Sequence, residues 1–121
     1  MAATQNPDPK RGEIWMVNFS PQVGDEIKKP RPAVVLNLPV FQTFQLRLVA
    51  PLTGWKPEFQ NRWTKVMIRP SQQNGLTKDS AVDVHQTRCV SLQRFSNKLG
   101  IMEARVLQLV AETIAAYVGV K

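Results

Sequence analysis

The chain has 121 residues, a length that fits a single domain, and its 43% hydrophobic and 21% charged content is that of a globular rather than a disordered protein. Its 16 Lys and Arg residues outnumber its 9 Asp and Glu residues, and the net charge of +7 favours an anionic partner: nucleic acid, an acidic protein or a membrane surface. A single cysteine excludes an internal disulfide, and no apolar run approaches the ~20 residues of a membrane span. We therefore expect a soluble, cytoplasmic protein without a signal peptide.

The N-terminal part of the chain predicts a tail, a strand and a long loop. Residues 1–9 are polar and contain two prolines, so we expect a flexible tail ahead of one domain at 10–121. Residues 13–19 are rich in aromatic and β-branched side chains and predict a strand. Residues 20–30 contain proline, glycine and several charges, which predicts a loop longer than a hairpin needs, and such loops are often functional.

A stiffly held arginine precedes the second predicted strand, which covers residues 32–37. Pro30 and Pro32 flank Arg31; each proline fixes its own φ, and Pro32 also disfavours a helical conformation of Arg31. The guanidinium can therefore be aimed, as in sites that bind phosphate. The alternative is an ordinary strand start with a solvated arginine.

Four later stretches have the residues and spacing of strands: 46–53, 65–69, 80–84 and 86–92. Residues 39–45 predict a connector with room for one helical turn. Pro51 predicts a strand edge or a bulge, because proline cannot donate a backbone hydrogen bond. The Asn74-Gly75 dipeptide predicts a turn. Short strands separated by turns are typical of a small β-barrel.

The C-terminal residues change to a helical period. We expect an amphipathic helix at 102–118 that packs on the barrel. Its apolar face is predicted to comprise Val106, Leu107, Val110, Ile114, Tyr117 and Val118.

The middle of the chain carries most of the positive charge. Twelve of the 16 basic residues fall between Lys28 and Lys98, against three acidic residues. Trp55 and Trp63 lie among these cations, and cations interleaved with aromatic rings favour binding of single-stranded nucleic acid. Either tryptophan could instead belong to the core or to a protein interface.

Metal and thiol chemistry are poorly supported. With one histidine, one cysteine and no carboxylate cluster at ligand spacing, we expect neither a metal site nor a cofactor. Cys89 lies in a strand-like run with apolar residues, which favours a buried, inert thiol over a nucleophile paired with His85.

The polar residues that remain lie at predicted strand ends. They are Asp25, Glu26, Arg31, Thr53, Asp83, His85, Gln86 and Arg88. If the strands are neighbours, these ends meet on one rim. A carboxylate, an arginine and a hydroxyl are sufficient for RNA cleavage by the 2′-hydroxyl, which needs a base, a group that stabilises the phosphorane and a proton donor for the leaving oxygen.

Six short pieces occur in order along the chain: 10–15, 18–21, 24–26, 31–36, 51–53 and 86–88. In order and spacing they resemble the MazF/PemK family of toxin endoribonucleases, over most of the chain from Lys10 to Val118. The resemblance implies an SH3-like barrel with added helices, as in MazF, PemK and CcdB, and a homodimer. It also implies sequence-specific, metal-independent cleavage of single-stranded RNA, including mRNA, to a 2′,3′-cyclic phosphate and a 5′-hydroxyl. A cognate antitoxin, with which the family binds DNA, would place an acidic, partly disordered segment in the RNA groove.

The resemblance also implies roles for individual residues, which are matched to the family's site residues by their position in the shared motifs. Arg31 matches the family's catalytic arginine, Thr53 its active-site threonine and Glu26 a carboxylate of the first loop. Asp25 and His85 are further candidates for catalysis or RNA contact, because some members differ at these positions. The residues expected to bind RNA are Lys28, Lys29, Trp55, Lys56, Arg62, Trp63, Lys65, Arg69, Gln86 and Arg88. Two alternatives remain at this point: a protein-binding toxin that resembles the CcdB gyrase poisons, and an RNA-binding barrel without catalysis.

Overall fold

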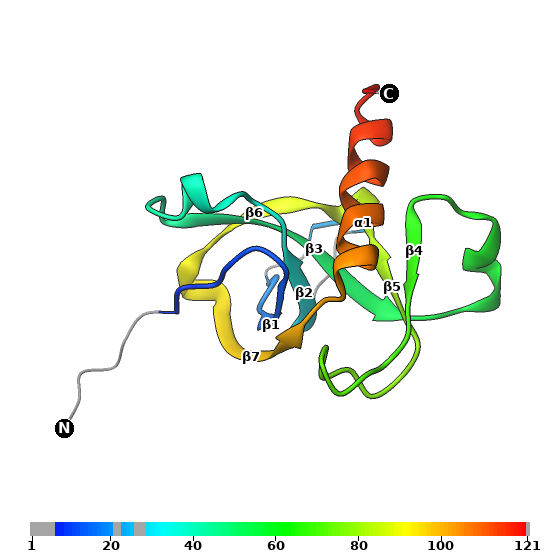
Figure 1. Ribbon diagram of the computed structural model, residues 1–121, viewed down its shortest axis with the longest axis horizontal. Helices are drawn as coiled ribbons and strands as arrows, with labels where there is room; N and C mark the ends of the chain where they lie inside the picture. The colour runs from blue at the N-terminus through cyan, green and yellow to red at the C-terminus, as the bar shows by residue number, and fades with distance from the viewer. Residues whose placement is uncertain (1–6, 21–22, 26–28, 121) are drawn as a thin grey trace.

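The computed structural model of the protein describes residues 7–20, 23–25 and 29–120. Its strands are β1 (Glu13–Val17), β2 (Arg31–Val35), β3 (Leu46–Gly54), β4 (Lys65–Ile68), β5 (Ser80–Asp83), β6 (Arg88–Ser91) and β7 (Phe95–Ile101), and its α-helix is α1 (Ala104–Tyr117). Four short 3₁₀ helices connect them: η1 (Pro39–Phe41), η2 (Pro57–Asn61), η3 (Val84–Gln86) and η4 (Leu92–Arg94). The small barrel with a C-terminal helix is thus confirmed (Figure 1).

All strand pairs are antiparallel, and β3 lies at the centre of the sheet. The order is β4-β5-β3-β2-β1-β7, with β6 also paired to β3. On one edge β3 pairs first with β6, up to Val49, and then with β5, from Leu52 onward. Pro51 lies where the partner changes, so its missing N–H interrupts little there. The prediction at Pro51 was a strand edge or a bulge; β3 is a central strand that pairs with Ala33 of β2 here, while its other side changes partner.

Alternating side chains give the curled sheet two separate apolar clusters. One lies between the sheet and α1 and contains Ile14, Val34, Leu36, Ala50, Leu52, Val66, Ile68, Val82, Val84, Met102 and Val110. The other lies on the opposite face and contains Val17, Phe19, Ala33, Val35, Val49, Val90 and Phe95. Because the side-chain period of a strand is two, consecutive apolar residues of β2 serve both clusters.

Helix α1 covers the first cluster with only part of its predicted apolar face. Val110 is fully buried, and Val106, Leu107 and Ile114 pack against the cluster, as expected. Tyr117 and Val118 were also expected to pack there, but they are 43% and 68% exposed. The last turns of α1 extend beyond the sheet (Figure 1). The apolar pattern of the helix therefore continues past the part of the sheet on which it can pack.

Strand β7 was not predicted. Phe95 is buried, but the next three residues are polar and exposed, so the segment shows no regular alternation. It forms a strand because it can pair with the open edge of β1. The pairing runs from Glu13↔Ile101 to Val17↔Phe95, and its register is irregular. Tertiary pairing here overrides a weak local preference.

The segment just before β1 is tied to the barrel by a buried arginine. Arg47 is 1% exposed, and its guanidinium donates to Pro9 O (2.9 Å) and contacts Asp8 Oδ1 (3.0 Å). Its other N–H groups donate to the carbonyls of Gln42, Phe44 and Leu46. Arg47 thus contacts the last two residues of the tail expected at 1–9, and residues 1–6 lie outside the described part. No helix among the described residues combines the length and apolarity that crossing a membrane requires.

Candidate active site and RNA-binding surface

Arg31 and Thr53 lie at neighbouring ends of β2 and β3. Arg31 is the first residue of β2 and pairs with Val17 of β1. On its other side, β2 and β3 pair in the register Ala33↔Pro51. Arg31 and Thr53 each lie two residues beyond this pair, so alternation along the strands puts both on the face of Ala33 and Pro51. The two residues predicted to be catalytic therefore share one face of the sheet.

The guanidinium of Arg31 is partly buried. The residue is half-buried, and its Nε atom is buried with no hydrogen-bond partner among the described residues. Because Nε is shielded from solvent, a ligand would bind the guanidinium through its terminal amino groups. Arginine matches phosphate oxygens well, so an anionic ligand suits this position.

Arg88 joins this face from β6. It pairs with Val49 of β3, and alternation along β3 puts Val49 and Thr53 on the same face of the sheet. The Arg88 guanidinium lies 6.0 Å from the ring centroid of Phe19, which is buried just beyond the end of β1. The aromatic face can hold this cation in place. Arg31 and Arg88 therefore add two positive charges to this face.

The loop between β1 and β2 is held at two points by η3 and η4. Gln86 Nε2 donates to the carbonyl of Asp25 (3.2 Å), whose side chain is exposed. Arg94 Nη1 donates to the carbonyls of Asn18 (3.0 Å) and Ser20, and the Asn18 amide donates back to Arg94 O (2.8 Å). Sequence reasoning missed Arg94, because no local pattern links it to residues more than 70 positions earlier. Glu26 and Lys28 lie outside the described residues, and Lys29 is exposed beside them.

The loop between β3 and β4 forms its own cluster. Trp55 is half-buried, with its ring edge-on to Phe59 at 5.8 Å, and Arg62 and Lys65 also approach the Phe59 ring. Lys65 lies 3.0 Å from Asp83 Oδ1, and both side chains are largely buried. Lys56 and Arg62 are exposed.

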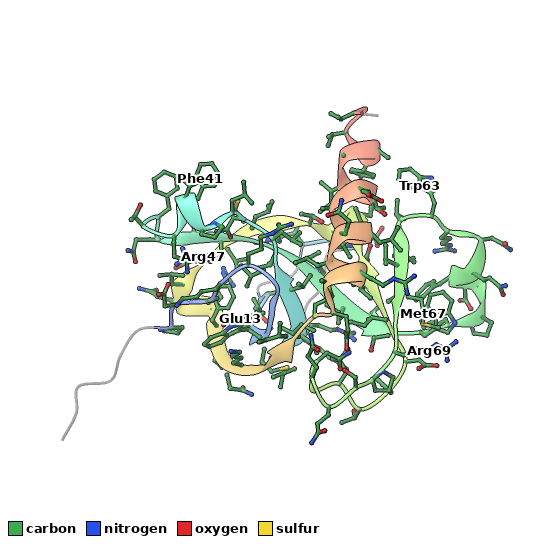
Figure 2. The ribbon with its side chains drawn as sticks, in the orientation of Figure 1. Glu13, Phe41, Arg47, Trp63, Met67 and Arg69 are labelled. Atoms are coloured by element: carbon green, nitrogen blue, oxygen red, sulfur yellow. The ribbon has the colours of Figure 1, made fainter. Side chains whose placement is uncertain are left out.

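The remaining predicted RNA contacts are distributed over two places. Trp63 and His85 are exposed near the C-terminal end of α1. Arg69 follows the far end of β4 and lies well apart from Trp63 (Figure 2). It borders a pocket of about 370 Å³ that Glu103 and Val106 also line. Arg31, Thr53 and Arg88 therefore share one face of the sheet, Gln86 contacts the loop at Asp25, and Arg69 follows the end of β4.

Cys89 is exposed, so its prediction as a buried thiol is wrong. Val90 faces the second apolar cluster, and alternation in β6 turns Cys89 to the other side. There Cys89 lines an apolar pocket of about 430 Å³ with Leu36, Asn37, Leu38, Phe41, Phe44, Leu46 and Leu48. Among the described residues, no three His, Cys, Asp or Glu side chains gather closely enough to hold a metal ion.

The chain is similar in sequence to a family of known proteins. Residues 10–118 match the family described as PemK-like, MazF-like toxin of type II toxin-antitoxin system. Endoribonuclease EndoA of Bacillus subtilis (strain 168) is 26% identical over 106 residues, which cover 87% of this chain and 90% of EndoA. Endoribonuclease MazF9 of Mycobacterium tuberculosis is 26% identical over 111 residues, with 87% and 92% covered.

Solved structures show the same fold. MazF from Deinococcus radiodurans superposes with a TM-score of 0.78 at 24% identity, covering 93% of this chain and 98% of its own. A MazE-MazF structure from the same organism gives a TM-score of 0.73 at 23% identity, covering 95% and 100%. The family match extends over nearly the whole domain and includes the segments that carry Arg31 and Thr53. This chain belongs to the PemK-like, MazF-like toxin family of type II toxin–antitoxin systems.

Proposed function

We propose that this protein is a toxin endoribonuclease that cleaves single-stranded RNA, including mRNA, at specific sequences and without a metal ion. The products would be a 2′,3′-cyclic phosphate and a 5′-hydroxyl. The observation that supports this most strongly is that Arg31, at the start of β2, lies on the same face of the sheet as Thr53 of the adjacent strand β3. A pure binding toxin does not need an arginine and a threonine hydroxyl on one face of the sheet.

In the proposed reaction the 2′-oxygen attacks the adjacent phosphorus and the bond from phosphorus to the 5′-oxygen breaks. A base accepts the 2′ proton, and a donor protonates the leaving oxygen. Arg31 would stabilise the charge that grows on the non-bridging oxygens, and the Thr53 hydroxyl would donate to one of them. Glu26 is our candidate for the base, with Asp25 and His85 as the other two; this assignment comes from the family resemblance.

The RNA would lie across the face that Arg31 and Arg88 make positive. The net charge of +7 attracts the phosphate backbone, and exposed cations such as Lys29, Lys56 and Arg62 extend the positive surface. Lys28 and Arg69 complete the set of proposed RNA-binding cations. Affinity should therefore fall steeply as salt rises, because bound cations release counterions from the RNA.

We propose that the protein is a homodimer. The apolar face, defined as Leu38, Val40, Phe41, Phe44, Leu46 and Cys89, is the surface that favours self-association. Its five hydrophobic side chains are each 46–73% exposed, which is unusual for a surface that stays solvated. Residues 32–46 contain no charge, so two copies of net charge +7 can meet there with little repulsion.

We also propose a cognate antitoxin and action in the cytoplasm. An acidic, partly disordered antitoxin segment would compete with RNA for the positive face, and the pair together would bind DNA. The similarity to the MazE-MazF structure from Deinococcus radiodurans supports this, as does the strongly positive charge of the chain.

The experiment is to incubate purified protein with a mixed-sequence RNA in EDTA and to map both new ends. We expect cleavage at a short recurring sequence, with cyclic phosphate and 5′-hydroxyl ends. A 2′-deoxynucleotide before the cut should abolish cleavage, and Thr53→Val, which removes only the hydroxyl, should reduce it. Binding without cleavage would support an RNA-binding barrel, and neither binding nor cleavage would support a protein-directed toxin. Cutting of the deoxy substrate would refute the mechanism.

A further inference from the structure

Three exposed aromatic rings from three separate elements meet at the C-terminal end of α1. Trp63 precedes β4, His85 lies in η3 and Tyr117 is the last residue of α1. The Trp63 and Tyr117 ring centroids are 6.3 Å apart, and those of His85 and Tyr117 are 5.5 Å apart. Trp63 is 61% exposed, so these rings form an aromatic cluster on the surface rather than a part of the core.

Specific contacts hold the cluster together. The Tyr117 hydroxyl and Nδ1 of His85 are hydrogen-bonded, 2.5 Å apart, which ties the helix end to η3. The Val84 amide donates to Thr64 O (3.0 Å), which ties η3 to the residue that follows Trp63. The three rings therefore have defined relative positions, although each is open to solvent.

The aromatic cluster adjoins the proposed RNA-binding face. His85 immediately precedes Gln86, whose side chain holds the loop at Asp25, and Trp63 immediately follows the exposed Arg62. An RNA strand that leaves the cut site along η3 would meet the rings next. Continuity with the positive face thus favours RNA as the occupant.

The chemistry of the cluster also fits a nucleobase. Indole, phenol and imidazole rings offer flat faces for stacking together with polar edges for hydrogen bonds. The apolar face around Phe41 is instead mainly aliphatic and phenyl, and it lies on the opposite side of α1 from Trp63 (Figure 2). The described part of the molecule therefore has two exposed hydrophobic surfaces of different character, and of these two the aromatic cluster has the polar rings.

We propose that Trp63, His85 and Tyr117 form a stacking subsite for one unpaired nucleobase that flanks the cut. This proposal rests on the proposed function, since it places a second part of the same RNA. It adds Tyr117, a residue of the C-terminal helix, to the RNA-binding surface, and it makes the flanking base part of substrate recognition.

The test uses a fluorescein-labelled RNA that spans the mapped cut and carries a 2′-deoxynucleotide there, so that it binds without being cleaved. Tyr117→Ala and Trp63→Ala should each weaken binding roughly tenfold, the magnitude expected for loss of one stacked base. Tyr117→Phe keeps the ring and should retain most affinity. Leu109→Ala, an exposed residue two turns earlier on α1, is the control and should bind normally.

An abasic scan of the same RNA locates the base. One abasic position should weaken binding to the wild type roughly tenfold and have no further effect on Tyr117→Ala, while other positions should act additively with the variant. Additivity at every position, unchanged affinity of the Ala variants, or a variant that alters only the oligomeric state would overturn the subsite. A wild type that neither binds nor cuts RNA would instead refute the proposed function, so the two failures are distinguishable.

Discussion

The Lys65 ammonium lies 3.0 Å from Oδ1 of Asp83, its partner across β4 and β5, beneath the ring of Phe59. The approach is outside hydrogen-bond geometry, so the contact is an electrostatic pair. Both side chains are largely buried, with 14% and 9% of their surfaces exposed. A lysine expected to contact RNA is thus already engaged with a carboxylate inside the fold.

Lys65→Met should therefore affect stability more than RNA binding. The change keeps most of the side-chain volume but leaves the Asp83 charge buried alone, which typically costs about 3 kcal/mol of unfolding free energy or more. Urea unfolding measures this loss, and the double variant Lys65→Met/Asp83→Leu should recover most of it. The salt dependence of RNA binding should not change, whereas Lys56→Met, at an exposed position, should lower the slope by about 1. A lower slope with unchanged stability in Lys65→Met would show that Lys65 binds phosphate.

Arg94→Met should slow cleavage without unfolding the protein. Arg94 donates hydrogen bonds to the carbonyls of the two residues that flank Phe19. The ring of Phe19 in turn contacts the Arg88 guanidinium. Small displacements at an active site can cost about 10²-fold in rate, so we expect kcat to fall at least tenfold with little change in KM. Hydrogen exchange at the Asn18 amide, which donates to Arg94 O, should become faster.

The controls for Arg94 separate positioning from stability. Arg94→Lys can still donate to one carbonyl and should recover part of kcat. Arg105→Met removes an exposed arginine from α1 and should have normal activity. If Arg94→Met lowers Tm sharply while the folded fraction cuts at the normal rate, Arg94 has only a structural role.

Arg47→Met should destabilise the fold severely. Arg47 was counted among the basic residues of the middle of the chain, yet it is buried against backbone carbonyls and Asp8. Methionine would leave those carbonyls without donors, and each buried unsatisfied group costs about 1–3 kcal/mol. Asp8→Asn should cost little, because the Asp8 side chain is 60% exposed. A folded Arg47→Met protein with weakened RNA binding would contradict this assignment.

Acid should weaken the contact between the start of α1 and the turn at Ser71 and Asn74. Glu103 immediately precedes α1, and its carboxylate accepts hydrogen bonds from both of those side chains. Burial raises the pKa of Glu103, but hydrogen bonds from Ser71, its own backbone and Asn74 together outweigh burial and lower the pKa below the ordinary 4.5. A carboxyl with a lowered pKa in the folded state adds stability above its unfolded pKa, and this stability is lost as the pH falls through the folded value.

Urea unfolding of the wild type and Glu103→Gln at several pH values tests this linkage. Glu103→Gln should be less stable than the wild type at pH 7, and the difference should shrink as the pH falls below 4.5. The pKa values of Asp8 and Glu13 are also lowered, but both residues are present in the two proteins. Their contributions therefore cancel when the unfolding free energy of Glu103→Gln is subtracted from that of the wild type. A difference that stays constant with pH would mean that the Glu103 charge does not matter.

The sequence predicted what depends on local pattern. Apolar, aromatic and β-branched runs separated by turn residues identified six strands, and the change to a helical period identified α1. The flanking prolines drew attention to Arg31, because proline restricts its neighbours wherever the chain goes, and the family resemblance made Arg31 a candidate for catalysis. That role stays a prediction. Strand β7 was missed because β1, rather than any pattern of its own, makes it a strand.

Residue partners could not be predicted, because register joins positions far apart in the chain. Nothing local distinguishes Lys65, which pairs with Asp83, from the exposed Lys56. Tyr117 continues the apolar period of α1, so only the length of the sheet beneath the helix reveals its exposure. The exposure of Cys89 could not be predicted either. Its neighbour Val90 is buried, but adjacent residues of a strand face opposite sides of the sheet.

The most direct test of the account is single-turnover cleavage by Arg31→Lys, with RNA affinity measured on the uncleavable substrate. Lysine keeps the charge but lacks the planar fork of donors, so the substitution tests geometry rather than sign. Because Pro30 and Pro32 restrain the backbone whatever the side chain, Tm should stay close to the wild type. We predict a rate lower by ~10²–10³, the usual cost of losing a preorganised donor, with most of the RNA affinity retained. Cleavage at the wild-type rate would contradict the account, because Arg31 would then be only one more cation on the RNA-binding face.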